Sequence, residues 1–154
     1  MAANGFTWRY NLSGGRPLIL TFFFKDTETL TKGDLVNIET GEIDLAVTAD
    51  TALAGTFEGP FDPKDATDGL PGKVAGTDST TLGKVIVNPD AVYGVFAENA
   101  RQPGAALDIT GATGAQTVAA SSNKEFVVVE RKLQTTDETR VMISQADHYL
   151  TKAL

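Results

Sequence analysis

Short runs of alternating apolar and polar residues, separated by glycine, proline and small polar residues, occupy most of this 154-residue chain. The pattern is clearest in residues 34–47 (DLVNIETGEIDLAV), where apolar residues stand at every second position on either side of Thr40-Gly41. Two such runs joined by a short turn predict a β-hairpin, because Gly41 adopts a positive φ at little cost. The side chains expected to share one face are Val36, Ile38, Ile43, Leu45 and Val47.

Other runs rich in β-branched and aromatic residues predict further strands. Residues 84–87 and 92–97 flank an Asn-Pro-Asp turn, and residues 125–131 and 139–146 provide the last two predicted strands. We expect the final strand to close the sheet. Residues 52–57 are a further candidate strand.

Residues 18–24 (LILTFFF) form the most hydrophobic run of the chain. Alternation places apolar side chains on both faces of this predicted strand. Left uncovered, such a strand would promote aggregation. We therefore expect it to be buried on both sides, either in the core or between the core and a subunit interface.

Residues 1–17 are expected to form an N-terminal arm in which Phe6, Trp8 and Tyr10 occupy alternate positions. Alternation indicates an extended segment with one aromatic face. Two interpretations remain open from the sequence. The arm packs the only tryptophan of the chain against a neighbouring subunit, where aromatic residues dominate binding energy, or it is an edge strand of the protein's own sheet.

Residues 18–154 are expected to form a single β domain, because no linker divides them. The predicted fold class is all-β, a compact barrel or sandwich of short, mostly antiparallel strands with little helix. A long loop is predicted at about residues 61–81, which are rich in Gly, Pro, Asp, Thr and Ser. Loops of this length are usually functional or disordered, so this one is either an exposed tip or an insertion that contacts a partner.

The composition narrows the possible partners. A net charge of −7 repels the phosphate backbone, so nucleic acid is not an expected partner. No run approaches the roughly 18 apolar residues that a membrane span needs, and residues 1–10 lack the basic and apolar regions of a signal peptide. We expect neither a membrane protein nor an exported one. The absence of cysteine excludes disulfides and thiolate metal sites.

The sequence gives little support for a catalytic or metal-binding site. Asp62, Asp65 and Asp68 are spaced by three residues, unlike the alternate ligands of an EF-hand calcium loop, and are interpreted as a solvated acidic loop. His148 is the only histidine, so no two-histidine zinc site can form. It is interpreted as a surface imidazole near the end of the chain. We predict no catalytic, cofactor-binding or metal-binding residues.

The order of several segments along the chain resembles that found in a known protein family. These segments are the KGDLV sequence before the hairpin, ALAGTFEGPF at residues 52–61, and the run at residues 85–130. Most telling are residues 104–129, where Gly-Ala, Leu-Asp-Ile-Thr-Gly, small residues and Phe-Val-Val-Val follow one another. In texture and order these segments resemble the head decoration, or capsid cement, proteins of tailed bacteriophages.

This resemblance implies a structural virion protein rather than an enzyme. Such a protein binds the outer surface of a phage capsid and stabilises the shell by clamping adjacent capsomers. The resemblance also implies the major capsid protein as partner, a homotrimer, no cofactor, and a position on the outer capsid surface after synthesis in the host cytoplasm.

Aromatic and apolar residues in the arm and the long loop are the expected capsid or subunit contacts. They are Phe6, Trp8, Tyr10, Phe61 and Leu70. The alternative function is a carbohydrate- or ligand-binding β-module, in which exposed Trp8 or Tyr93 provides a stacking platform.

Overall fold

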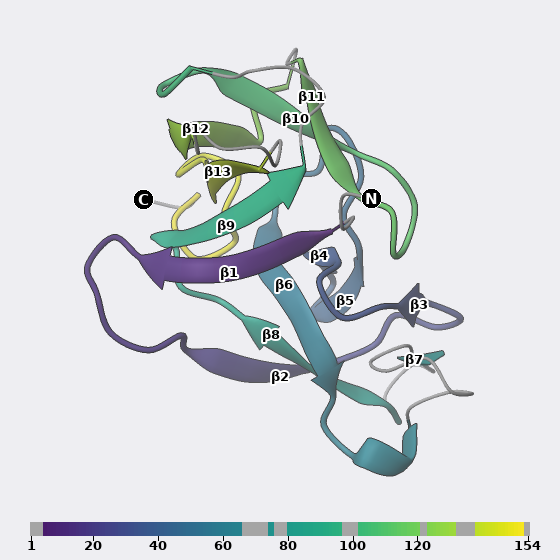
Figure 1. Cartoon of the computed structure of the whole chain (residues 1–154). Helices are drawn as coiled ribbons and strands as arrows, with labels where there is room; N and C mark the ends of the chain where they lie inside the picture. The colour runs from purple at the N-terminus through teal and green to yellow at the C-terminus, as the bar shows by residue number, and fades with distance from the viewer. Residues whose placement is uncertain are drawn as a thin grey trace.

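The computed structural model describes residues 5–65, 74–75, 80–96, 102–120, 123–131 and 138–152. Two antiparallel sheets pack against each other, one above the other in Figure 1. The one helical segment among these residues is a 3₁₀ turn, Pro63–Asp65. No described helix is long and apolar enough to cross a membrane. The all-β prediction is therefore confirmed.

The larger sheet has six strands and contains most of the second half of the chain. Its order is β1 (Phe6–Asn11), β9 (Ala91–Phe96), β13 (Glu138–Ile143), β12 (Phe126–Arg131), β10 (Ala106–Thr110) and β11 (Thr117–Ala120). The expectation that the last strand closes the sheet is wrong. Strand β13 pairs with β12 on one side and β9 on the other, so it lies in the interior of the sheet.

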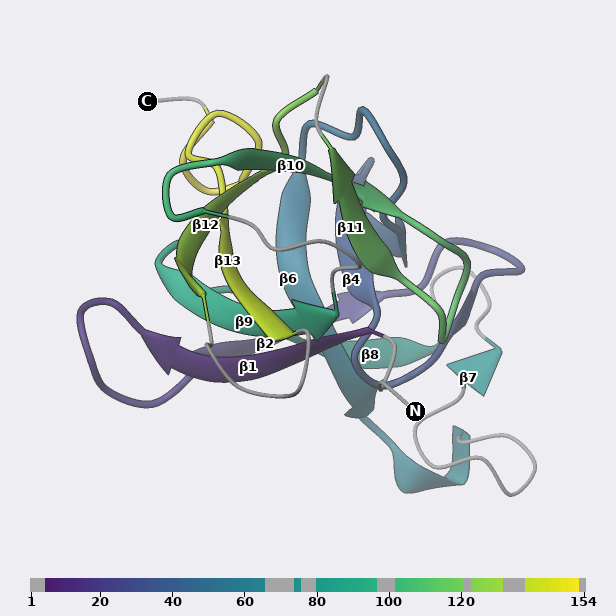
Figure 2. The same cartoon turned by 45° about the horizontal axis from the view of Figure 1, so that its top comes forward.

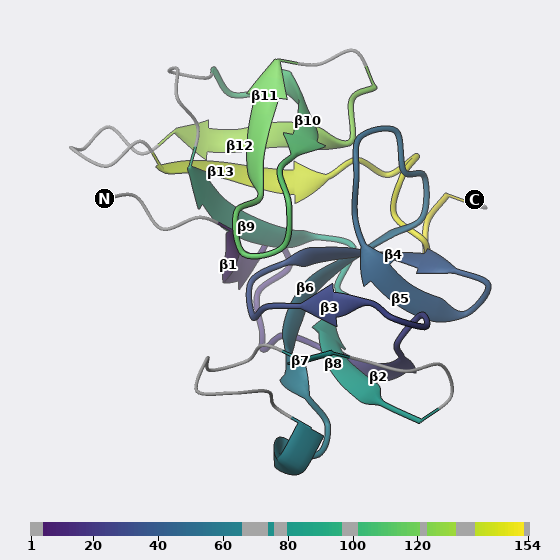
Figure 3. The same ribbon diagram turned by 90° about the vertical axis from the view of Figure 1, so that its right-hand side faces the viewer.

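The second sheet has five strands. Its order is β2 (Ile19–Phe23), β8 (Leu82–Ile86), β6 (Leu53–Pro60), β4 (Leu35–Glu39) and β5 (Glu42–Leu45). A two-stranded pair, β3 (Thr29–Leu30) with β7 (Val74–Ala75), lies beside it, as Figure 3 shows from the side.

The predicted hairpin is confirmed as β4 and β5. Val36 pairs with Leu45, and Ile38 pairs with Ile43. Thr40 and Gly41 have φ angles of 50° and 83°, the two successive positive values of a tight hairpin turn. Val47, however, lies beyond β5 and is 53% exposed, so the shared apolar face ends before it.

The two sheets form a sandwich rather than a barrel. Strands β1 and β11 are the edges of the six-stranded sheet, and β2 and β5 are the edges of the five-stranded sheet. Between the two edges of the smaller sheet, the described residues form one isolated bridge, which joins Phe24 and Ile43. Figure 2 shows β1 and β2 on the same side of the molecule. This side of the sandwich is therefore bounded by two edge strands.

Two clusters of buried apolar side chains stabilise the fold. The first core lies between the sheets and comprises Phe6, Leu35, Ala46, Leu53, Ile86, Ala91, Tyr93, Val95, Leu107, Ile109, Val118, Phe126, Val128, Val141 and Ile143. The second core, on the other face of the smaller sheet, comprises Phe24, Leu30, Val36, Ile43, Ala54, Phe57, Val85 and Val87. Strands β4, β6 and β8 contribute to both cores, because alternate side chains point to opposite faces.

Candidate interaction surface

A β-bulge divides the aromatic residues of β1. Trp8 pairs with Tyr93 and Tyr10 pairs with Val92, so Arg9 is an extra residue in this strand. A bulge shifts the alternation by one position. The expected single aromatic face is therefore wrong, because Tyr10 lies on the face opposite to Trp8. The edge-strand interpretation of this segment agrees with the pairing of β1 and β9.

Phe6 belongs to the protein's own core. It is 2% exposed, its ring stacks on Phe126 with centroids 5.3 Å apart, and it meets Tyr93 edge-on at 6.4 Å. Trp8 is partly buried against the same core, and its Nε1 donates a hydrogen bond to Asn11 Oδ1 at 3.0 Å. In this arrangement Trp8 keeps part of its surface exposed, whereas Phe6 is buried beneath the strand.

Tyr10 takes part in a polar network on the outer face of the six-stranded sheet. Its hydroxyl donates to Glu130 Oε1 at 2.7 Å, and the Arg140 guanidinium lies 5.7 Å from its ring centroid. Partial burial and the Glu130 carboxylate raise the pKa of Tyr10. The hydrogen bonds from Tyr10 and Arg140 lower the pKa of Glu130. Arg9 and Glu138 form a second ion pair beside this network.

Strand β2 is an exposed edge, which corrects the expectation of a strand buried in the core. Four apolar side chains in and beside it retain 40–51% of their accessible surface: Leu18, Ile19, Leu20 and Phe23. Only Phe22 and Phe24 turn inward, against the second core. The burial of this strand between the core and a subunit interface, the other expected environment, stays a prediction.

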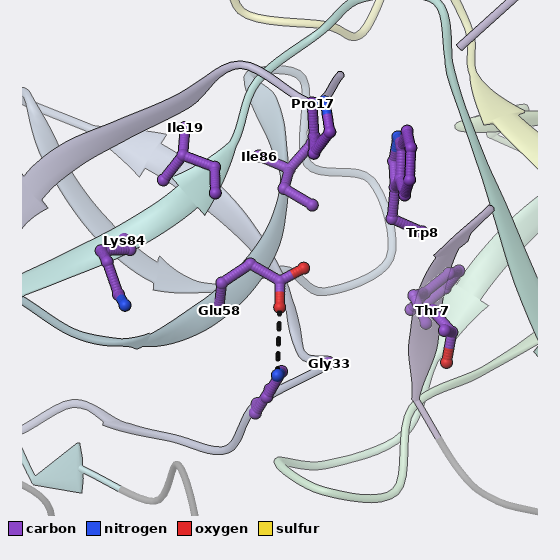
Figure 4. Close-up of a pocket in the computed structure, with 10 residues that line it drawn as sticks. Thr7, Trp8, Pro17, Ile19, Gly33, Glu58, Lys84 and Ile86 are labelled. Carbon is purple, nitrogen blue, oxygen red and sulfur yellow. Dashed lines mark ion pairs between the residues drawn. The ribbon is translucent and has the colours of Figure 1, made fainter. Parts of the chain in front are cut away.

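A groove with a volume of about 620 Å³ opens between β1 and β2. Its apolar wall includes Trp8, Pro17, Ile19 and Ile86, which Figure 4 shows around the same space. Ile19 also belongs to the exposed edge, so the groove and β2 form one continuous surface. We call this surface, from Trp8 across the groove to Phe23, the β2 surface.

Three charged side chains line the groove: Lys32, Glu58 and Lys84. Lys32 Nζ lies 4.0 Å from Glu58 Oε2, the ion pair drawn in Figure 4. Burial raises the pKa of Glu58, although Lys32 opposes the shift. Lys84 lies beyond ion-pair distance of the described carboxylates, but its charge also acts to lower the pKa of Glu58. The groove therefore has an excess of positive charge in a chain whose net charge is −7.

The two contact residues predicted in the long loop have different outcomes. Phe61 is 60% exposed, and its N–H donates to the Leu82 carbonyl at 2.9 Å, which fixes its backbone beside β8. Leu70 lies outside the described residues. A contact of Phe61 with a partner therefore stays a prediction, made at a residue whose ring is exposed.

His148 is not a surface residue. It is fully buried and bridges to Leu53, and its Nδ1 accepts a hydrogen bond from the N–H of Leu150 at 3.1 Å. Its Nε2 has no hydrogen-bond partner among the described residues. Burial lowers the pKa of His148 to about 4. The imidazole packs the turn at residues 148–152 against β6. The nearby Ser144 hydroxyl donates to Asp147 Oδ2 at 2.9 Å.

The sequence did not predict a pair of buried acidic residues, Asp108 and Glu125. Glu125 accepts hydrogen bonds from the N–H groups of Ala49 and Ile109, and Asp108 accepts one from Lys124 N at 2.8 Å. Burial, with a smaller contribution from Asp108, raises the pKa of Glu125 to about 7. Since both carboxyl groups bind backbone N–H groups, they fix turns rather than form an open site. Among the described residues, no cluster of three or more metal-ligating side chains occurs.

No protein-family model and no curated protein matches the chain. Among solved structures, the chain is similar to the N base of head fiber gp8.5 in bacteriophage phi29, with 19% sequence identity and a TM-score of 0.47. The similarity covers 82% of this chain and 95% of the chain in that N base structure. At this identity and TM-score, the likeness does not assign a function to the chain.

Proposed function

We propose that this chain is a structural, non-enzymatic protein of a phage virion. In this proposal it binds the outer surface of the capsid and stabilises the shell by clamping adjacent capsomers. The observation that carries the proposal is the β2 surface, an apolar edge strand that the described residues leave uncovered. Exposed apolar edges are usually protected in proteins that act alone, and larger apolar patches mark interaction sites. The order of sequence elements supports a capsid as the partner.

The charge of the molecule fits this position. A β domain of net charge −7 gains nothing from binding DNA, but it can lie on the outside of a DNA-filled shell. A protein that binds only the assembled lattice stabilises it by mass action. Many modest contacts, repeated over the lattice, then add through multivalency.

The proposed partners are the major capsid protein and two further copies of this chain in a homotrimer. The proposed capsid or subunit contact includes Trp8 and Phe61, with Tyr10 on the opposite face of β1. Phe6 contributes by supporting Trp8 through the core. Leu70, which lies outside the described residues, remains part of the proposed contact. The proposed location is the outer capsid surface, after synthesis in the host cytoplasm.

Co-sedimentation tests this proposal. Capsid shells that lack this chain are prepared from the phage whose genome encodes it and are mixed with the purified protein. Binding is measured from the protein that sediments with the shells. The temperature at which the shells rupture is measured separately. We expect saturable binding and a higher rupture temperature. The double variant Leu20→Thr/Phe23→Thr should bind at least about tenfold more weakly, because it removes apolar area from the interface. Val47→Thr changes an apolar side chain outside β2 that is at least as exposed, at 53% against 40–41%, and serves as the matched control. Shells that neither bind the protein nor gain stability would refute the proposal.

A second candidate function rests on Trp8. An aromatic ring beside polar groups in a groove is a feature of carbohydrate-binding modules, as in the alternative predicted from the sequence. Tyr93 cannot provide a stacking platform, because its side chain is fully buried. A glycan array distinguishes the two functions. Binding that disappears in Trp8→Ala would favour the carbohydrate module.

A further inference from the structure

The outer edge of β2 has backbone groups available for a further strand. Val87 N donates to Leu18 O at 3.0 Å, and Phe24 N donates to Thr81 O at 2.9 Å. Hydrogen-bonded positions alternate along an antiparallel pair, so the even-numbered residues of β2 pair with β8. The N–H and C=O groups of Ile19 and Thr21 therefore point away from β8. In the described part of the chain, β8 is the one strand that pairs with β2.

The register of β2 and β8 places a cation beside this edge. Thr21 pairs directly with Lys84, so the two side chains share the groove face of the sheet. A residue added opposite Thr21 would lie two strand spacings, or about 10 Å, from the Lys84 backbone. A lysine and an acidic side chain together span that separation.

We propose that the free edge of β2 receives an extended apolar segment of the partner, and that an acidic residue opposite Thr21 in this segment binds Lys84. The inference rests on the proposed function in that the segment belongs to the capsid partner. Charge complementarity favours an acidic occupant. The groove contains two lysines, Lys32 and Lys84, but one carboxyl group, that of Glu58. Burial raises the pKa of Glu58, which disfavours its negative charge further. Alternating apolar side chains of the segment would cover Ile19 and Phe23 on one face and Leu20 on the other.

A second copy of this chain fits the edge less well. It would bring another net charge of −7 together with an identical pair of groove lysines, so neither the whole molecules nor the grooves are complementary. The far end of β2 is also obstructed, because Lys25 N donates to Ile43 O of β5 at 2.9 Å. A segment that ends opposite Phe23 avoids this obstruction, whereas the copy's own chain continues past it.

A random decapeptide library displayed on yeast provides the probe, and the full chain is the bait. We expect enrichment of peptides with alternating apolar residues and a central Asp or Glu. Thr21→Pro removes one outward N–H and should weaken binding of the selected peptides about tenfold, whereas Thr21→Val, which keeps the N–H, should bind within about twofold. Lys84→Glu should weaken binding about fivefold and regain it when the central acidic residue is changed to Lys. Lys84→Arg is the matched control, because it keeps the charge.

The results separate this inference from the proposed function. Selected peptides without acidic enrichment, no enrichment at all, or equal binding to Thr21→Pro would overturn the inference. Concentration-dependent self-association that disappears in Thr21→Pro would assign the edge to a second copy and also overturn it. Shell binding that is unchanged in Thr21→Pro and Lys84→Glu would leave the capsid role intact and refute this site. Peptide binding without shell binding would do the reverse.

Discussion

Gly55 in strand β6 has no room for a side chain beside the end of β8. Its φ is 147°, and a Cβ atom there would lie 1.8 Å from the carbonyl oxygen of Ile86 and 2.6 Å from the Tyr93 hydroxyl. A backbone oxygen cannot move aside without displacing the strand that carries it. We predict that Gly55→Ala lowers the free energy of unfolding by more than about 3 kcal/mol, as measured by urea denaturation.

Gly59→Ala separates the clash from the backbone strain. Gly59 has a φ of 116°, but a Cβ atom there would meet nothing within 4 Å. Its substitution should therefore cost only the conformational strain, about 1–2 kcal/mol. Equal losses in the two variants would show that the close approach at Gly55 is unimportant.

His148 makes stability depend on pH. Its pKa is lowered to about 4 in the folded chain by burial, against about 6.5 when unfolded. Between these values the unfolded chain binds a proton that the folded chain excludes. The stabilising contribution is therefore complete above pH 6.5 and is lost as the pH falls towards 4. At pH 5 we predict a loss of about 2 kcal/mol relative to pH 7.

Two acidic residues change stability in the opposite direction as the pH falls. A variant of His148 is therefore needed to isolate the contribution of the histidine. Burial raises the pKa of Glu125 to about 7 and, chiefly by burial as well, that of Asp44 to about 6, which favours the folded state at lower pH. In His148→Asn, the side-chain oxygen can still accept the Leu150 N–H, but nothing titrates. The stability advantage of wild type over His148→Asn should shrink by about 2 kcal/mol from pH 7 to pH 5. An unchanged difference would contradict the prediction.

Individual residues differ in how far the sequence predicts their roles. Thr40-Gly41 specified its turn, because both residues are adjacent and the required φ angles are local. Tyr10 and His148 were misplaced for non-local reasons. The bulge at Arg9 arises from the register with β9, and the burial of His148 arises from packing on β6. No sequence pattern indicated the buried position of Glu125. Its carboxylate accepts a hydrogen bond from the N–H of Ala49, which is far away in the sequence.

At the scale of elements, β2 combines one inward and one outward role. Phe22 packs towards the second core and meets Tyr149 edge-on at 6.0 Å, whereas Leu20 and Phe23 remain about 40% exposed. We predict that Phe22→Ala lowers the free energy of unfolding by about 2 kcal/mol. Leu20→Thr/Phe23→Thr should change it by less than about 1 kcal/mol. Urea denaturation measures both.

The same double variant should bind less of a dye that fluoresces on apolar surfaces. Phe22→Ala should not reduce dye binding while the chain is folded. If the double variant were as destabilised as Phe22→Ala, the exposed side chains would contribute to the core of the isolated chain, and β2 would not be a free surface.

Hydrophobic pattern predicted the existence of most strands but not their positions within the sheets. The run at residues 18–24 is apolar on both faces, which correctly gave a strand and wrongly allowed a place in the core. Strand β13 alternates regularly, with the burial of a strand covered on one face, yet it lies in the sheet interior. Side-chain periodicity reports which faces are covered, whereas backbone pairing decides which strands are edges. For the same reason, the sequence could not predict the groove beside β2.

At the scale of the whole molecule, two cores share one set of strands. Leu35, Leu53 and Ile86 point into the first core, and their neighbours Val36, Ala54 and Val85 point into the second. Loss of either core would uncover one face of β4, β6 and β8. The sandwich should therefore unfold as a single cooperative unit, in agreement with the absence of an interdomain linker in the sequence.

Paired substitutions test this cooperativity. Val128→Ala creates a cavity in the first core and Val36→Ala one in the second, and each should cost about 2 kcal/mol. Trp8 fluorescence reports on the first core. Hydrogen exchange of the Phe57 amide, which donates to Asp34 O at 2.7 Å, reports on the second. If strands common to both cores couple them, each substitution will lower both readouts by the same free energy. A substitution that affects only the nearer readout would mean that the two sheets unfold independently, and β2 could then open for a partner while the six-stranded sheet stays folded.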